Sequence, residues 1–180
     1  MIIAVNHPAA WKQEPFTRLH SVAEDFRAWA PQRQGHWLSQ VTGDPNAKWQ
    51  PITRAITIRQ PWAWAILSAG KDIENRSRKM APPGWYLLHA AKGMTLDEYE
   101  AATAFISRIT DRPIPRASEL LRGGIIGAFQ ITGWTPDSQS PWFVGQWGAE
   151  IGVALPLPGG KLFVPCAGAL GVFTPNLTGL

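Results

Sequence analysis

The sequence ITIRQPWAWAILSAGKDIENRS, residues 56–77, contains the most informative local pattern of the chain. Together with the two residues before it, its beginning (residues 54–59) alternates between apolar and polar side chains, as a half-buried strand does. Residues 61–69 are apolar and compatible with a helix that begins at a proline. Residues 72–77 can form a strand with Ile73 and Asn75 on one face and Glu74 and Arg76 on the other. The pattern therefore predicts a strand–helix–strand unit at the start of the regular part of the chain.

The polar side chains of this unit fall where its elements begin and end, and we expect them to line one cleft. Six of them are candidates for ligand contact: Arg59, Gln60, Trp62, Lys71, Glu74 and Arg76. Arginine binds phosphate through two parallel hydrogen bonds, and an indole ring stacks on a nucleic-acid base. Lys71 and Glu74 are the candidate catalytic residues if the protein is an enzyme, since a partly buried lysine beside a carboxylate can transfer a proton. The alternative is a structural role: an ion-pair network for the residues of the second strand, and capping for Arg59 and Gln60.

Downstream of this unit, short strand patterns separated by turns continue to the end of the chain. Thr95 and Glu98 form the two ends of a capping box, which predicts a helix from there to about residue 108. Glycine and proline, with 17 and 16 residues, are too frequent for a helical bundle. Candidate strands lie at residues 84–91, 123–132, 150–156, 161–165 and 168–174. We therefore expect an α+β fold, mainly β: a small closed or partly open barrel of about five to seven strands with two or three flanking helices.

Residues 1–53 differ from the rest of the chain, and we expect them to form an N-terminal extension to a barrel domain in residues 54–180. The extension contains four of the ten tryptophans and three of the four histidines, with little strand patterning. Residues 21–30 match a short amphipathic helix, and residues 42–51 are rich in turn-forming residues. Three roles for the extension stay open: packing on the barrel, covering the cleft, or binding a protein partner.

Over roughly residues 54–175 the chain resembles the ASCH domain family of the PUA-like superfamily. The resemblance begins with Ile58-Arg59-Gln60-Pro61-Trp62-Ala63 and continues with Gly70-Lys71-Asp72-Ile73-Glu74-Asn75-Arg76, which contains the K-x-x-E-x-R spacing of the family signature G-x-K-x-x-E-x-R. Later elements follow in order: His89-Ala90-Ala91-Lys92, Gly123-Gly124-Ile125-Ile126-Gly127, Ser140-Pro141-Trp142-Phe143 and Pro165-Cys166-Ala167-Gly168-Ala169-Leu170-Gly171. A single short signature would be a weak signal, but the ordered series makes the resemblance specific.

The resemblance implies a PUA-like β-barrel with a cleft between barrel and helices, lined by the signature residues. Members of the family are proposed to bind RNA or act on nucleosides, and others are proposed to be ribonucleases or coactivator modules. One branch hydrolyses N4-acylated cytidines with a Lys, a Thr and a Glu. Lys71 corresponds to the lysine of that branch, but Glu74 stands at its threonine position, and its separate downstream glutamate has no assigned counterpart here. The mechanism of that branch therefore does not transfer intact, and the family alone does not determine an activity.

Three further residues are candidate ligand contacts: His89, Lys92 and Trp142. The alternatives are a hydrogen-bonded structural role for His89, a solvated Lys92, and anchoring of a loop by Trp142. Cys166, the only cysteine, is expected to be buried and inert, because no cation lies close to it in the sequence. The sequence has neither metal-ligand spacing nor a phosphate-binding loop motif, and we expect no metal or cofactor.

The net charge of +4 is concentrated between Arg54 and Lys92, a segment with seven basic and two acidic residues. Such a segment indicates an anionic partner such as nucleic acid, and a solvated basic face is the alternative. The N-terminal sequence lacks the basic start and apolar core of a signal peptide, and no apolar run reaches the roughly 18 residues of a membrane span. The expected location is the cytoplasm, with no membrane partner.

These observations are compatible with three functions. The favoured one is binding of RNA, single-stranded DNA or a modified nucleotide in the basic cleft. The second is an amidohydrolase that acts on an N4-acylated cytidine or a related modified nucleoside, in which Lys71 and Glu74 exchange protons with a water or a leaving amine. The third is a protein-interaction adaptor that uses the tryptophan-rich N-terminal extension.

Overall fold

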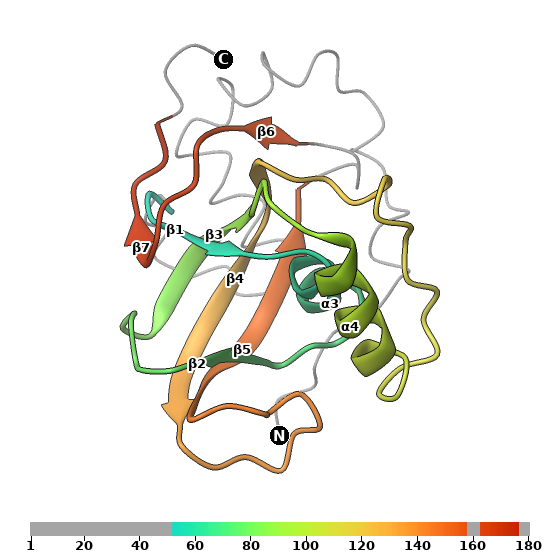
Figure 1. Cartoon of the computed structure of the whole chain (residues 1–180). Helices are drawn as coiled ribbons and strands as arrows, with labels where there is room; N and C mark the ends of the chain where they lie inside the picture. Colours follow the sequence, from blue (N-terminus) through green and yellow to red (C-terminus); the bar gives the residue numbers. More distant parts are fainter. Residues whose placement is uncertain (1–51, 158–162, 177–180) are drawn as a thin grey trace, which may run out of the picture.

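The computed structural model describes residues 52–157 and 163–176, whose arrangement is shown in Figure 1. This part of the chain contains seven strands and two helices. In chain order the elements are β1 (Ala55–Ile58), α3 (Trp62–Ser68), β2 (Ile73–Arg76), β3 (Gly84–Ala90), α4 (Leu96–Ile106), β4 (Gly124–Thr135), β5 (Trp147–Pro156), β6 (Val164–Pro165) and β7 (Val172–Phe173). The expected α+β fold, mainly β, is confirmed.

The seven strands of this part of the chain form one curled sheet with the shape of a half-barrel (Figure 1). The strand order is β2-β5-β4-β3-β1-β7, and β6 pairs with β4. Strands β1 and β3 are parallel, with Ala55 opposite Leu87, and the other pairings are antiparallel. The long strand β4 carries register shifts against both β3 and β5. Such bulges increase the local twist, so the sheet curls instead of remaining flat.

Both faces of the sheet carry buried apolar side chains. Alternate residues of β3 divide between the two faces: Tyr86 and Leu88 belong to one apolar cluster, and Leu87 belongs to another. The first cluster also contains Phe129 and Ile131 of β4. Complete burial of one such side chain contributes about 1.5–3 kcal/mol, so the two clusters provide the main stabilisation of the half-barrel.

Helices α3 and α4 lie next to each other on one side of the sheet (Figure 1). Both contribute to a third apolar cluster, which also includes Trp142. The ring centroids of Trp62 and Phe105 are 5.6 Å apart in an edge-to-face arrangement that joins the two helices. The expected capping box at the start of α4 is confirmed, because Thr95 Oγ1 accepts from Glu98 N and Glu98 Oε2 accepts from Thr95 N.

The observed bounds differ from the sequence expectation mainly in the second half of the chain. Strands β4 and β5 are longer than expected because they pair with each other beyond their apolar runs, out to Thr135 opposite Gly148. The strand expected at residues 168–174 is reduced to β7, and the residues before it line a pocket described below. The helix predicted at 21–30 and the role of the N-terminal extension lie outside the described residues.

Candidate functional site

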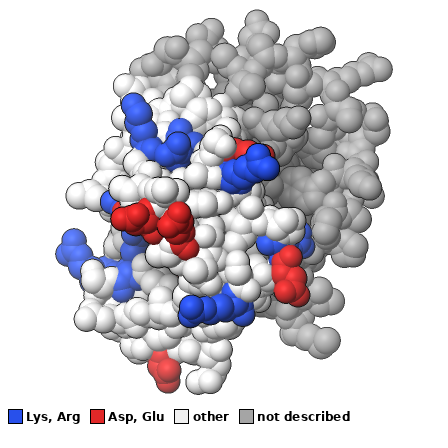
Figure 2. All heavy atoms as spheres, turned by 45° about the vertical axis from the view of Figure 1, so that its right-hand side comes forward, with Lys and Arg blue, Asp and Glu red and all other residues white. Residues whose placement is uncertain are grey.

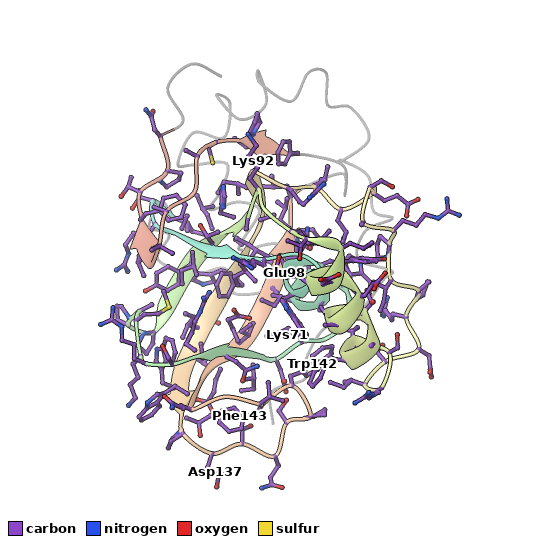
Figure 3. The ribbon with its side chains drawn as sticks, viewed as in Figure 1. Lys71, Lys92, Glu98, Asp137, Trp142 and Phe143 are labelled. Atoms are coloured by element: carbon purple, nitrogen blue, oxygen red, sulfur yellow. The ribbon has the colours of Figure 1, made fainter. Side chains whose placement is uncertain are left out.

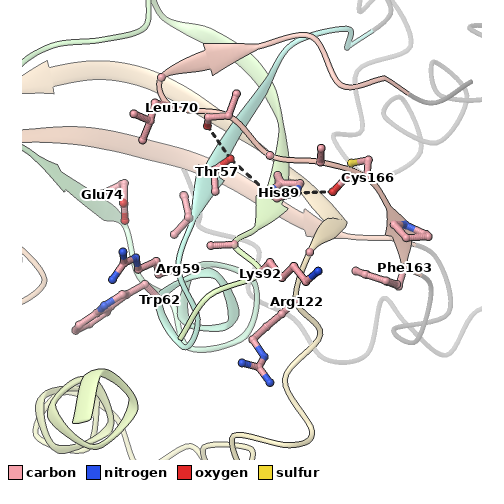
Figure 4. A pocket seen from close by; sticks show the side chains of 18 of the residues that line it. Thr57, Arg59, Trp62, Glu74, His89, Lys92, Arg122, Phe163, Cys166 and Leu170 are labelled. Atoms are coloured by element: carbon pink, nitrogen blue, oxygen red, sulfur yellow. Dashed lines mark hydrogen bonds between the residues drawn. The ribbon is translucent and has the colours of Figure 1, made fainter. Parts of the chain in front are cut away.

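A pocket of about 1100 Å³, the larger pocket, opens where the ends of β1, β2 and β3 meet the residues before β4 (Figure 4). Residues on both sides of β6 complete its lining. The Lys, Arg, Asp and Glu side chains that line it are Arg59, Glu74, Arg76, Lys92 and Arg122. Four cations and one carboxylate therefore surround a space large enough for a nucleotide-sized ligand.

One side of the larger pocket, the C-terminal wall, consists of residues 165–171. Hydrogen bonds from two neighbouring strands hold this wall (Figure 4). Thr57 Oγ1 of β1 donates to Ala169 O at 3.0 Å and lies 3.3 Å from His89 Nδ1 of β3. His89 Nε2 lies 3.1 Å from Cys166 O. Because a carbonyl oxygen can only accept, Nε2 carries the proton of this bond.

His89 supports the C-terminal wall through its contact with Cys166 O, and it also lines the larger pocket. Its side chain is 1% exposed and packs edge-to-face on Phe173, with 5.7 Å between the ring centroids. A Cβ at Gly168 would lie 2.5 Å from His89 Cε1, so the wall can approach the imidazole this closely only at a glycine. The placement favours the hydrogen-bonded structural interpretation of His89.

Lys71, Glu74 and Arg76 form one connected charge network. Lys71 Nζ lies 2.8 Å from Glu74 Oε2 and also donates to Ile73 O, and Arg76 Nη2 lies 3.3 Å from Glu74 Oε1. Arg76 Nη2 also donates to Thr57 O at 3.2 Å, which ties β2 to β1. The side chains of Lys71 and Glu74 are 2% and 12% exposed. The contacts are those of a structural network, and Glu74 and Arg76 still line the larger pocket.

A smaller pocket of about 510 Å³ adjoins the larger one, since Arg59, Trp62 and Glu74 line both. Lys71 lines only the smaller pocket. Helix α4 supplies an apolar side of the smaller pocket through Ala101, Ala102 and Phe105. The half-buried indole of Trp62 and the carboxylate of Glu74 therefore lie at the boundary between the larger and the smaller pocket.

Arg59 and Gln60, which follow β1, have different roles. Arg59 is exposed and forms an ion pair with Glu98 at the start of α4. Gln60 is 3% exposed, its Nε2 donates to Leu121 O at 2.9 Å, and its Oε1 accepts from Trp64 N at 3.0 Å. The Gln60 amide thus caps the first turn of α3. The capping interpretation fits Gln60, whereas Arg59 is available on the surface of both pockets.

Trp142 lies away from both pockets. It is 3% exposed, and its ring centroid is 6.4 Å from that of Phe105 on α4. Its carbonyl oxygen accepts from Asn75 Nδ2 at 2.7 Å. Figure 3 shows Trp142 beside α4, on the same side of the molecule as Lys71. The structure therefore places Trp142 in the third apolar cluster, where it anchors its loop and lines neither pocket.

Two cations of the larger pocket stand apart from the charge network: Lys92 after β3 and Arg122 before β4. Figure 3 shows Lys92 near β6, well separated from Lys71. The two lysines therefore do not contact the same group of a ligand. Arg122 was not among the residues predicted from the sequence. In the sequence, Arg122 is marked only by its position directly before the glycine pair at 123–124. Arginines beside turns are common, so this position alone does not indicate a pocket residue.

Cys166 is half-buried in the C-terminal wall. Burial raises the pKa of its thiol, and the backbone hydrogen bond from Ile125 lowers it in part. The side chain is therefore a neutral thiol near pH 7 and a poor nucleophile.

The charges of the surface are mixed. On the face shown in Figure 2, basic and acidic side chains form separate small groups and no continuous basic surface. Within residues 52–157 and 163–176, no group of three His, Cys, Asp or Glu side chains is placed to hold a metal ion. Among the helices of the same residues, none is long and apolar enough to cross a membrane.

No protein-family model matches this chain, and a search of curated proteins finds no match either.

Proposed function

We propose that this protein binds single-stranded nucleic acid, RNA foremost, or a modified nucleotide in the larger pocket. The observation that carries the proposal is the set of four cations and one carboxylate that line this pocket together with the half-buried indole of Trp62. Cationic side chains attract the phosphate backbone. Stacking of a base on an aromatic ring contributes about 1–3 kcal/mol. The pocket combines both kinds of contact in one space.

An unpaired donor supports a ligand that carries hydrogen-bond acceptors. The Nε of Arg76 is buried and has no hydrogen-bond partner within the part of the chain that the structure describes. A buried donor without a partner costs about 1–3 kcal/mol. Because Arg76 lines the larger pocket, a carbonyl oxygen of the ligand is the partner that we assign to this donor.

We also propose that the chain belongs to the ASCH domain family. Support comes from the K-x-x-E-x-R spacing, whose three side chains are joined in one charge network beside both pockets. The half-barrel with two adjacent helices is compatible with the PUA-like barrel that the family implies. The resemblance leads us to expect a ligand site at this charge network.

Binding is tested by fluorescence anisotropy with a labelled single-stranded RNA decamer at low salt, with a DNA decamer and nucleotides as competitors. Trp62→Ala is expected to weaken binding at least about fivefold, because loss of about 1 kcal/mol of stacking has that effect. Trp64→Ala is the matched control, since Trp64 lies on the same helix and lines neither pocket. The proposal fails if the wild type binds none of these ligands or if both variants lose affinity equally.

A separate observation favours a second candidate function, hydrolysis of an N4-acylated cytidine. Lys71 and Glu74 are in contact, little exposed, and line the smaller pocket, whose apolar side can receive an acyl group. In such a reaction Glu74 accepts a proton from water as the water oxygen attacks the acyl carbon. The carbon–nitrogen bond then breaks and Lys71 protonates the leaving amine, which releases cytidine and a carboxylic acid.

The hydrolysis candidate is tested by incubation with N4-acetylcytidine and chromatographic detection of cytidine. Glu74→Gln is expected to lower the rate by about 100-fold or more, the usual contribution of a general base. Glu98→Gln is the matched control, because Glu98 lines the same smaller pocket but pairs with Arg59. If the wild type releases no cytidine from a panel of acylated nucleosides, the enzymatic function is excluded and the binding function is retained.

A further inference from the structure

Lys92 and Arg122 both line the larger pocket, and Figure 4 shows the two side chains between Trp62 and Phe163, apart from Glu74. Both residues are exposed. They come from positions 30 residues apart in the sequence, so their proximity is a product of the fold. Among the described residues, they are the two cations of the larger-pocket lining that take part in no ion pair.

The backbone holds the two cations in this arrangement. Gly123 N donates to Ala90 O at 2.8 Å, which joins the residue after Arg122 to the strand that ends just before Lys92. Gly123 has a φ of 81°, in the left-handed region that favours glycine. A Cβ placed on Gly123 would lie 3.5 Å from Lys92 Cβ, so the stem of the lysine lies against this turn. The backbones of the two residues are therefore fixed relative to each other before any ligand arrives.

No acidic side chain among the described residues balances the charges of the pair. Arg59 is paired with Glu98, and Arg76 and Lys71 share Glu74. In contrast, Lys92 and Arg122 make neither an ion pair nor a side-chain hydrogen bond within residues 52–157 and 163–176. A ligand anion here thus meets two cations that no carboxylate of the described residues pairs with, whereas the cations near Glu74 are each paired with a carboxylate.

We propose that Lys92 and Arg122 form a phosphate-binding subsite of the larger pocket. The forked guanidinium of arginine matches two phosphate oxygens, and the lysine ammonium adds a point charge. The source of the phosphate rests on the proposed function, which supplies a phosphodiester of single-stranded nucleic acid, while a free phosphate compound offers the same chemistry. The Lys71–Glu74–Arg76 network is then the region that meets the uncharged part of the ligand.

The test compares two double variants of equal charge change by anisotropy with the RNA decamer between about 50 and 200 mM salt. In K92Q/R122Q the subsite is lost, whereas R108Q/R112Q removes two exposed arginines that line neither pocket. Each lost phosphate contact lowers the slope of log K against log salt by about 0.7 for a single strand. We expect a reduction of about 1.4 in K92Q/R122Q and none in R108Q/R112Q. Inorganic pyrophosphate, titrated by calorimetry, is the second probe.

The outcomes separate the subsite from the proposed function. Loss of RNA affinity and salt slope in K92Q/R122Q alone supports the subsite with a nucleic-acid phosphate. Pyrophosphate binding that K92Q/R122Q abolishes, without binding of RNA, DNA or nucleotides by the wild type, supports the subsite and rejects the proposed function. RNA binding that is the same in both double variants rejects the subsite and leaves the proposed function standing. Both fail if the wild type binds neither pyrophosphate nor any of the nucleic acids and nucleotides.

Discussion

At the scale of single residues, Glu74 controls the charge balance at the boundary between the two pockets. One of its carboxylate oxygens contacts Lys71 and the other lies near Arg76. The Lys71 ammonium is almost completely buried, so water cannot replace the carboxylate as its partner. Removal of Glu74 therefore leaves two cations without compensation, whereas removal of Lys71 leaves Glu74 paired with Arg76.

This difference predicts unequal effects of two substitutions. Glu74→Ala is expected to lower the free energy of unfolding by about 3–5 kcal/mol, as loss of one partner of a buried pair usually does. Lys71→Met is expected to cost less, because methionine fills much of the volume of the lysine stem and leaves no buried charge unpaired. Urea unfolding of both variants measures how far each substitution lowers the free energy of unfolding. A larger loss for Lys71→Met would contradict the central position of Glu74.

Tyr86 gives the fold a pH dependence in the alkaline range. Burial raises the pKa of Tyr86, and the Arg54 guanidinium over its ring lowers it in part. The unfolded chain loses the phenolic proton around pH 10, while the folded chain retains it to higher pH. Tyr86 therefore makes its full contribution to the free energy of unfolding below about pH 10. This contribution is lost as the pH rises through the higher pKa of the folded state.

Tyr86→Phe is expected to remove this alkaline loss of stability. Near neutral pH the substitution should cost about 1 kcal/mol, for the hydrogen bond from Tyr86 Oη to Pro82 O. Urea unfolding at neutral pH and at about pH 10.5 checks both effects, since the second condition lies above the ordinary tyrosine pKa. Tyr99→Phe, which loses a comparable bond to Pro115 O, is the control and should keep the alkaline decline. An unchanged decline in Tyr86→Phe would refute the assignment.

At the scale of elements, helix α4 begins at its capping box and supplies the apolar side of the smaller pocket. Thr95→Ala is expected to lower the free energy of unfolding by about 1 kcal/mol, the usual cost of losing such a cap. Thr103→Ala, in the middle of the same helix, should cost less because alanine has the higher helix propensity. Thermal or urea unfolding compares the two, and equal losses would contradict a specific role of the cap.

The C-terminal wall depends on Thr57 for one of its attachments to the barrel. Thr57→Val keeps the shape of the side chain but removes the hydroxyl, so opening of the wall should become easier by about 1 kcal/mol. Because Cys166 is the only cysteine and lies in the wall, its alkylation by iodoacetamide reports this opening. We expect alkylation about fivefold faster in Thr57→Val and close to the wild-type rate in Thr57→Ser. Equal rates in all three proteins would show that Thr57 does not hold the wall.

The elements near the signature could be predicted from the sequence because their causes are local. Alternation of side chains predicted β1 and β2, and the Thr95 capping box predicted the start of α4. The contacts of Lys71, Glu74 and Arg76 also lie within a few residues, so their network was foreseen as one of two interpretations.

The rest of the site depends on distant pairings that no local pattern reveals. Arg122 reaches the pocket because Gly123 pairs with the end of β3, and the C-terminal wall reaches it because Cys166 N donates to Gly123 O. Trp142 is drawn into the core by α4, a contact that its position in a turn-rich loop does not indicate. The positions of these residues follow only from the three-dimensional structure of the curled sheet.

At the scale of the whole molecule, the half-barrel brings three independent sets of groups around one space. The indole of Trp62, the cations Lys92 and Arg122, and the C-terminal wall all line the larger pocket, and Figure 4 shows the two cations apart from Trp62. Because the surface seen in Figure 2 has mixed charges, the preference for an anionic ligand is expected to arise in the pocket. We therefore propose that nucleic acid binds in the larger pocket, beside the wall that contains Cys166.

Protection of Cys166 tests this claim most directly, because the wild-type protein carries its own single reporter thiol in the pocket wall. The rate of alkylation by iodoacetamide is measured with and without a single-stranded RNA decamer at a concentration about 100 times its Kd, where the site is almost fully occupied. We predict alkylation slower by about tenfold or more in the presence of RNA. An alkylation rate that RNA does not change would contradict binding in this pocket.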